Sequence, residues 1–539
     1  REELDVFNLF IQHSQTETRF YSIEDFEDGF AKQIEYGNAT SHTPEDAAGE
    51  FAYALNTVYL QDEFELADYD VTIMAGLRYD LYSSDDVPAF NQNFQDRYGF
   101  SNQQNLDGVD LIQPRFGFNW QASDNLEVRG GFGLYSGGNP NVWISNSYSN
   151  DGIRNIQEKI KKVQITGDDA IAFNGTGLAG YDIPVELYEA VGSGSADSDT
   201  NVTDPNFKIP SEWKYALGAT YTTQSDYVIM ADILLSKKQD SAIIKNLADG
   251  VVDTAPDGRP IYGGVNHGWN ADFLLTNVDG DDAESTVLSL AISKVYENGF
   301  KFSASYAYSD VQDVHPMTSS VAFSNYHGIA VSDPENPQLS ASNYEIPHRF
   351  TLNLSYAHEI FSGYKTKFSL FGQANEGHPY TYSFTGNSDG LGFNDEDRQL
   401  LYVPLENDPN VVYGDDFKLQ AFNDFIKSEG LDKYRGKILP RNALSSDWWL
   451  KFDFKIEQEF AGFTPSQKGS AFFVVKNVGN LLNDDWGVLK QGSFLQGAVE
   501  TSINDDNQYA YKYFTNPSTQ NRQDNTSLWQ VRIGIKYDF

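Results

Sequence analysis

The sequence predicts an all-β fold, a transmembrane antiparallel β-barrel, from three observations. Residues 527–539 alternate apolar and polar side chains and end on Phe539. A period of two places these kinds on opposite faces of a strand, as in a wall between lipid and water. Similar segments recur in pairs, with short turns at one end and long polar stretches at the other. No run of roughly 18 apolar residues occurs, so a helical span is excluded.

The paired segments predict a series of hairpins, and their turns carry the residues that turns prefer. Glu297, Asn298 and Gly299 make the clearest turn, because Asn and Gly tolerate positive φ. The predicted hairpins are 51–66 with 69–82, 112–121 with 125–135, 213–223 with 227–237, 287–296 with 300–308, 349–360 with 366–374, and 449–460 with 470–482. Single strands are expected at 6–12, 509–514 and 528–539.

The strand count bounds the size of the barrel. We expect about 14 to 16 strands, whereas large plugged transporters have about 22. An open sheet with two unpaired edges is not viable in lipid. The missing strands are therefore expected in another polypeptide, a nicked fragment or residues outside this sequence.

The long stretches between hairpins are the expected functional loops. Residues 415–431 predict a short amphipathic helix that an Asp caps and Gly430 ends. Residues 153–164 predict a second helix, because Ile153, Ile156, Ile160 and Val163 share a helical face, although a strand also fits.

Composition excludes several classes of function. The net charge of −39 disfavours nucleic-acid binding, because phosphates would be repelled. The absence of Cys excludes disulfides and thiol chemistry. The eight His are scattered singly and no nucleophile has a visible base, so an enzyme is not expected. Aromatics make up 14 % of the chain, which suits the girdles of a barrel whose mean hydropathy is −0.48.

Two sets of loop residues are candidate binding groups. Aromatic side chains in the loops are candidates for stacking on a ligand, although interface girdles and loop packing explain such residues equally well; they are Trp143, Tyr148, Tyr380 and Tyr382. Acidic clusters suit Ca²⁺, although solvated turns explain them too; the candidates are Asp279, Asp281, Asp282, Asp395 and Asp397. No other cofactor is expected.

The chain resembles TonB-dependent outer-membrane receptors, specifically the Oar-like branch. The residues that carry the resemblance are YLQDE at 59–63 with GLRYD at 76–80, PRFGFNW at 114–120 with RGGFG at 129–133, GNPNVWISN at 138–146 and DPNFKIP at 204–210 with Trp213 and Lys214. PHRF at 347–350, KNVGN at 476–480 and the terminal Phe539 are similar to general features of the superfamily.

The resemblance implies that residues 1–539 form the C-terminal part of a receptor barrel in the bacterial outer membrane, with loops at the cell surface. Outer-membrane lipid, lipopolysaccharide and an extracellular ligand are the implied partners. The family's plug domain, its TonB box and the first barrel strands are not visible, so residue 1 lies inside what resembles the barrel. TonB is expected to act through that missing plug fragment.

Three functions remain open at this point. The leading hypothesis is TonB-energised uptake of a scarce solute too large for porins. The second is a surface adhesion or protein-export role of the Oar type. The third is a soluble secreted β-protein or enzyme, which would bury its aromatic faces inside a sandwich. Parity places Lys451, Asp453 and Lys455 toward the lumen and Phe452 and Phe454 toward lipid.

Overall fold

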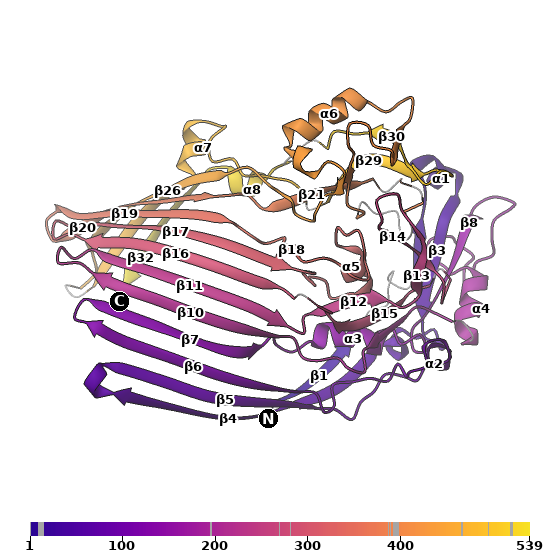
Figure 1. The fold of residues 1–539 in the computed structure, drawn as a ribbon, viewed down its shortest axis with the longest axis horizontal. Coiled ribbons are helices and arrows are strands. Elements are labelled where there is room, and N and C mark those ends of the chain that lie inside the picture. Colours follow the sequence, from indigo (N-terminus) through magenta and orange to yellow (C-terminus); the bar gives the residue numbers. More distant parts are fainter. Residues whose placement is uncertain are drawn as a thin grey trace.

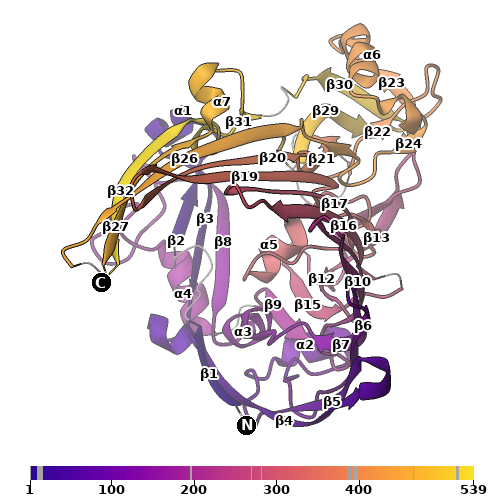
Figure 2. The same ribbon diagram turned by 90° about the vertical axis from the view of Figure 1, so that its left-hand side faces the viewer.

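One large antiparallel sheet forms a curved wall (Figures 1 and 2). The computed structural model describes residues 2–8, 16–194, 197–268, 270–280, 282–385, 388, 390–391, 398–464, 467–493, 495–517 and 521–538. The 15-stranded sheet contains, in spatial order, β1 (Glu2–Asn8), β4 (Gly49–Leu66), β5 (Val71–Ser83), β6 (Asp110–Ser123), β7 (Leu126–Ser136), β10 (Ser211–Thr222), β11 (Val228–Gln239), β16 (Glu284–Val295), β17 (Phe300–Asp313), β19 (His348–Phe361), β20 (Tyr364–Asn375), β26 (Trp449–Ala461), β27 (Lys468–Lys476) and β32 (Gln530–Asp538). The short β18 (Ser340–Ala341) pairs with β17. The sequence-predicted hairpins and the strand count are confirmed.

Side chains alternate between the two faces of the wall, and neighbouring strands pair in register. One face is therefore apolar and the other is polar. On one face Phe116 lies opposite Phe132, which lies opposite Tyr215, and their rings lie 5.5 and 6.3 Å apart between centroids. On the other face the Lys451 ammonium lies 3.4 Å from the Asp453 carboxylate. We call these the outer and inner faces. The predicted parity at residues 451–455 is confirmed.

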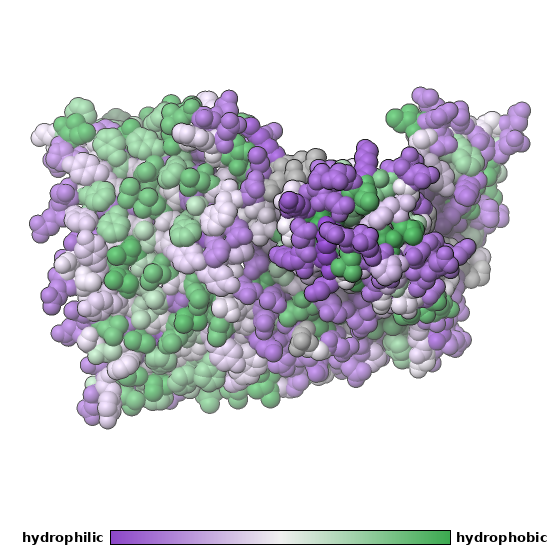
Figure 3. Space-filling view, turned by 45° about the horizontal axis from the view of Figure 1, so that its top comes forward, coloured by the Kyte–Doolittle hydropathy of each residue, from purple (hydrophilic) through white to green (hydrophobic). Residues whose placement is uncertain are grey.

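The outer face is an apolar band on the convex side of the wall. Figure 3 shows this band over the strands, with hydrophilic side chains at the turns and over the loops. Its most exposed members include Leu60, Leu77, Leu217, Leu290, Leu450 and Ile533. Among the described residues, no helix is both long enough and apolar enough to cross a membrane. The band gives the strands the lipid-facing surface that a membrane span needs.

The long loops build further elements at one end of the wall (Figure 1). Two small sheets and four helices lie at this loop end. One sheet contains β2 (Thr16–Arg19), β3 (Phe30–Asn38) and β8 (Ile156–Gln164), and the other contains β9 (Thr200–Thr203), β12 (Ala242–Asn246) and β15 (Asp272–Asn277). The helices are α1 (Ile23–Asp28), α2 (Gln92–Tyr98), α3 (Asn141–Ser149) and α4 (Val185–Ser193). A hairpin of β13 (Asp249–Thr254) and β14 (Pro260–Gly264) and the helix α5 (Ala322–His327) complete this group.

A second group of loop elements lies on the far side of the same end. It comprises β21 (Pro379–Phe384), β22 (Tyr402–Val403), β23 (Val411–Tyr413), α6 (Leu419–Ser428), β24 (Lys437–Ile438), β25 (Leu444–Ser445), β29 (Leu495–Ile503) and β30 (Tyr509–Phe514). Beside β26 lie α7 (Val478–Leu482), β28 (Lys490–Gln491), β31 (Asn521–Arg522) and α8 (Asp524–Ser527).

Three local predictions need correction. The predicted helix at 153–164 is wrong, because residues 156–164 form β8 and pair with β3. Apolar residues four apart, such as Ile156 and Ile160, satisfy a period of two as well as a helical period. The predicted strand 470–482 ends at Lys476, since Asn477 has φ +51° and starts α7. The strand predicted at 509–514 exists as β30 but lies in a loop sheet outside the wall.

We predict that Phe452→Arg destabilises the inserted barrel, whereas Lys451→Gln is tolerated. Phe452 lies on the outer face and its ring covers Gly372. An arginine on the lipid face near the bilayer midplane costs about 2–4 kcal/mol. The measurement is urea unfolding of both variants in lipid vesicles. The opposite ranking of the two variants would reverse the assignment of the faces.

Candidate functional site

At the loop end of the wall, the loops fold back to the inside of its curve. Figure 2 shows α3, β12, β15 and α5 inside the curve of the wall. There Tyr148 of α3 stacks on Phe51 of β4 at 4.1 Å between ring centroids. Its hydroxyl donates to the Asp86 carbonyl at 2.8 Å. The loops at this end therefore share one hydrophobic core with the wall.

Other loop segments pack around a second core, to which Ala255 and Ile261 of the β13–β14 hairpin also contribute. We call the described residues within 379–445 and 495–514 the outer module. Its core contains the fully buried side chains of Phe422, Ile426, Leu431, Tyr509 and Tyr511. The predicted amphipathic helix at 415–431 is confirmed as α6, and its apolar face supplies Phe422 and Ile426 to this core. The predicted Asp cap is wrong, because α6 begins at Leu419 and its N-cap is Lys418, which makes no side-chain capping bond. The opposite, polar face of α6 is exposed to solvent, where a ligand can reach it.

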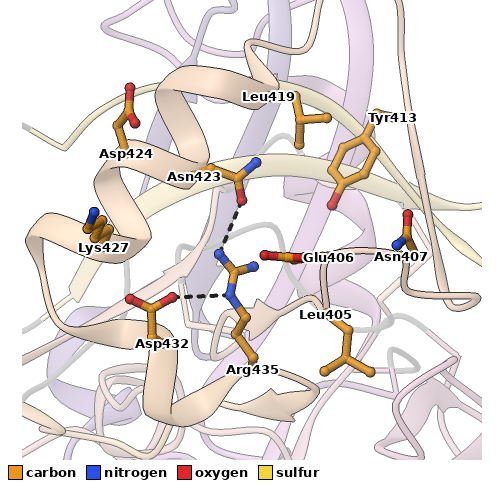
Figure 4. Close-up of a pocket in the computed structure, with 10 residues that line it drawn as sticks. All are labelled: Leu405, Glu406, Asn407, Tyr413, Leu419, Asn423, Asp424, Lys427, Asp432 and Arg435. Carbon is orange, nitrogen blue, oxygen red and sulfur yellow. Dashed lines mark hydrogen bonds and ion pairs between the residues drawn. The ribbon is translucent and has the colours of Figure 1, made fainter.

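A hollow of about 520 Å³ lies between that polar face of α6 and the loop before β23 (Figure 4). Its lining residues come from three nearby segments: Leu405, Glu406, Asn407 and Tyr413; Leu419, Asn423, Asp424 and Lys427; and Asp432 and Arg435. A pocket of several hundred Å³ is large enough for a small molecule or part of a chain-like ligand.

Arg435 is the most constrained group of the hollow. Its Nε donates to the Asp432 carboxylate at 3.2 Å, one terminal nitrogen to the Pro404 carbonyl at 2.9 Å and the other to the Asn423 side-chain oxygen at 3.2 Å. These three bonds fix the plane of the guanidinium in the position that Figure 4 shows. A fixed planar donor is pre-organised for hydrogen bonding, so little entropy is lost when a ligand binds.

The hollow offers both hydrogen-bond donors and acceptors. Burial, with the Asp408 carboxylate nearby, raises the pKa of Tyr413, so its phenol stays a neutral donor. Glu406 and Asp424 supply acceptors, and Lys427 supplies donors. The mixture favours a neutral or zwitterionic polar ligand over a strongly charged one. These residues were not predicted from the sequence, although Leu419, Asn423 and Lys427 recur every four residues on the predicted helix.

Three of the four predicted aromatic binding residues lie in cores. Tyr148, Tyr380 and Tyr382 are 1, 4 and 0 % exposed. The hydroxyls of Tyr380 and Tyr382 both donate to Glu429, at 3.2 and 2.9 Å. Loop packing, the alternative explanation from the sequence, therefore accounts for these three rings, and a role for them in binding a ligand stays a prediction. Trp143 is partly buried against the core at the open end, and its contact with a ligand stays a prediction.

The predicted acidic metal ligands do not come together where the structure describes them. Asp282 accepts hydrogen bonds from the Ser241 and Ala283 amides, which is a turn-forming role. The Asp279 carboxylate is exposed and lies 3.3 Å from the Lys245 ammonium. Asp281, Asp395 and Asp397 lie outside the described residues. Within the described residues no group of three His, Asp or Glu side chains is placed to hold a metal ion.

Residues 7–469 match the family model of the outer membrane beta barrel domain. The chain belongs to this family. The barrel is thus an outer-membrane protein whose loop end, with the outer module, lies at the cell surface.

Solved outer-membrane transporters are similar to this barrel at low identity. The outer membrane transporter YddB of Escherichia coli has 12 % identity and a TM-score of 0.45, over 91 % of this chain and 46 % of YddB. A mutant of the ferric enterobactin receptor PfeA of Pseudomonas aeruginosa has 10 % identity and a TM-score of 0.42, over 94 % and 50 %. The FrpB iron transporter of Neisseria meningitidis has 11 % identity and a TM-score of 0.39, over 97 % of this chain and 50 % of FrpB. The barrel spans about half the length of these proteins. No relative was found among curated proteins.

The inner face of the barrel carries a second cavity, of about 450 Å³. Small residues open it, namely Gly117, Gly131, Ala216 and Gly218. The Arg129 guanidinium crosses above Gly218 and lies 2.6 Å from the Asp232 carboxylate. A Cβ at Gly218 would lie 2.2 Å from that carboxylate, so the ion pair requires glycine there. The only sequence signal was a lone charge, Asp232, within the apolar run of β11.

At the loop end of the wall, two buried carboxylates lie within hydrogen-bond distance of the same tyrosine hydroxyl. The Tyr326 hydroxyl lies 2.8 Å from Glu335 and 3.1 Å from Asp249. One hydroxyl hydrogen cannot serve two carboxylates, so the second contact needs a proton on one of the acids. Burial, with the charge of Asp249, raises the pKa of Glu335 to about 7, against hydrogen bonds from Tyr326 and the Asn246 amide. Glu335 is therefore the acid that holds the proton.

We predict that Glu335 promotes opening of the segment around α5 as the pH rises from about 5 to 8. The folded pKa of Glu335 lies above its unfolded value, so its stabilising contribution is present below the unfolded pKa and is lost as the pH rises through about 7. Buried His327 and His315 act in the opposite direction, because burial lowers their pKa values to about 3 and about 4. The measurement is therefore the ratio of amide hydrogen exchange in the wild type to that in Glu335→Gln over residues 322–335, in which the contributions of the two histidines cancel. This ratio should rise by roughly tenfold to a hundredfold between these pH values. A ratio that does not change with pH contradicts the assignment.

Proposed function

We propose that this chain is the C-terminal part of the barrel of a TonB-dependent receptor of the Oar-like branch, which imports a scarce solute too large for porins. The observation that carries the proposal is a wall with an apolar outer face, a polar inner face and loops that pack against its inside at the loop end. Loops in this position narrow the path of a solute, so the proposal includes a controlled rearrangement for passage.

The proposal requires a partner for the two edges of the wall. Within the described residues, β1 is paired on one side with β4, and β32 on one side with β27. Unpaired backbone groups facing lipid cost several kcal/mol each. We infer that the remaining strands and the plug lie on another part of the protein, and that TonB acts through that plug. Lipopolysaccharide and outer-membrane lipid surround the complete barrel.

The hollow of the outer module is the proposed first contact for the solute. It lies at the cell surface, holds a fixed guanidinium and presents mixed polar groups. Binding and passage involve no covalent bond changes and need no cofactor, and calcium in the acidic loops stays a prediction.

The alternative is surface adhesion or protein export of the Oar type. The outer module extends away from the wall (Figures 1 and 2), which also suits contact with a macromolecule.

We predict that detergent extraction recovers this chain with a second species that carries a plug and further strands. Intact mass and amino-terminal sequencing of the purified material test this. Release of this chain alone from the membrane, without detergent, would contradict the interpretation as a membrane barrel.

We predict that deleting the protein abolishes growth on one limiting solute too large for porins, as does deleting TonB. The measurement is growth of both deletion strains on a panel of such solutes. Loss of attachment or of a secreted protein, with growth intact on every solute, would favour the adhesion or export role.

We predict that Leu419→Trp, which fills the hollow, weakens uptake of that solute at least about tenfold in apparent affinity, or 1.4 kcal/mol. Leu419 is 40 % exposed on the rim, so the core of the outer module is unaffected. Leu178→Trp, at a 57 % exposed position in another loop, is the matched control. If both variants transport equally, the hollow is not the contact site, while the growth phenotype still stands.

A further inference from the structure

The turn that contains α7 is a rigid corner held by two buried amides. Asn477 and Asn480 are 1 and 2 % exposed. The Asn477 amide donates to the carbonyls of Gly487 and Ser527, at 2.9 and 2.6 Å. The Asn480 amide donates to those of Asp484 and Trp486, at 3.0 and 3.1 Å. With its backbone fixed in this way, the corner cannot turn its outward side chains into a core.

Those outward side chains are large and apolar. Leu481, Leu482 and Trp486 are 42, 74 and 56 % exposed. They cluster within a few residues of one another on a segment that buries few apolar side chains of its own. A fixed cluster of this kind is unfavourable in water, because the apolar surface stays hydrated.

The corner continues the lipid-facing surface of the wall. Figures 1 and 2 place α7 beside the loop end of β26, on the convex side. Its neighbours on β26 belong to the outer face: Leu450 is 53 % exposed, and Trp448, at 52 %, precedes the strand. The Trp448 ring lies 6.2 Å from that of His348, which lies 5.4 Å from Tyr308. Aromatic rings at this height form the girdle of an outer-membrane barrel.

We propose that the α7 corner is inserted into the outer leaflet, with Leu481, Leu482 and Trp486 among the lipid acyl chains. The continuity with the outer face identifies lipid as the occupant. The composition agrees, because Asn483, Asp484 and Asp485 are exposed beside the apolar cluster and would lie at the level of the head groups. Trp486 has the amphipathic ring that interfaces select. The inference holds for uptake and for adhesion alike.

Spin labelling tests this directly, because the chain contains no Cys. A nitroxide on Leu482→Cys is measured by power saturation in the complete protein reconstituted in vesicles of phosphatidylcholine and lipopolysaccharide. Oxygen concentrates among acyl chains, whereas a water-soluble nickel chelate stays outside. We expect the ratio of oxygen to nickel accessibility at Leu482 to exceed severalfold that at Leu405→Cys, on the hollow, and to lie below that at Leu290→Cys, in the middle of β16 and deeper in the bilayer.

Each other result overturns the proposal. A ratio equal to that at Leu405 means that the corner lies in water. Low accessibility to both reagents means that protein covers the corner, for example the remaining strands of the barrel. Trp486→Cys gives an independent second site on the same corner, and heat-modifiable gel mobility confirms that each labelled variant is folded.

Discussion

The structure depends on one constraint, the pairing of backbone N–H and C=O groups between neighbouring strands. Lipid supplies no alternative partners, so strands in the wall must stay in register. Because the side-chain period is two, a slip of one residue would turn Phe452 inward and Lys451 outward along with every other pair. The apolar outer face and the charged inner face are thus two consequences of a single register, in which Gly218 leaves room on the inner face for the Arg129–Asp232 pair.

The loops are governed by different physics. They lie in water and can bury apolar side chains only against one another, so they form cores of their own at the end of the wall. Charged groups tie these cores together across long sequence distances, as where Arg441 lies 2.8 Å from Asp313 and Arg259 donates to Gln399 at 3.1 Å. Buried ion pairs and hydrogen bonds of this kind specify one arrangement of the loops, which leaves the hollow around Arg435 pre-formed.

This division explains what the sequence could predict. The hairpins were predictable because the alternation within a strand is local, and α6 because Phe422, Ile426 and their neighbours recur with helical period. The burial of loop side chains was not predictable, since Tyr382 contacts Phe425 and Glu429 from another part of the chain. An exposed tyrosine and a buried one look identical in sequence. The end of β27 was missed for a related reason, as positive φ at Asn477 depends on partners near Gly487 and Ser527.

The same constraint bears on how a solute would pass. The apolar outer face faces lipid, so the polar inner face is the side of the wall that can border water. The edges β1 and β32 lie on one side of the molecule (Figure 2), so strands that complete the pairing would also enclose the inner face. The cavity around Arg129 and Asp232 opens on this face. Its charged groups keep their hydration when they border water, so an aqueous path along the inside of the wall needs no desolvation of this pair.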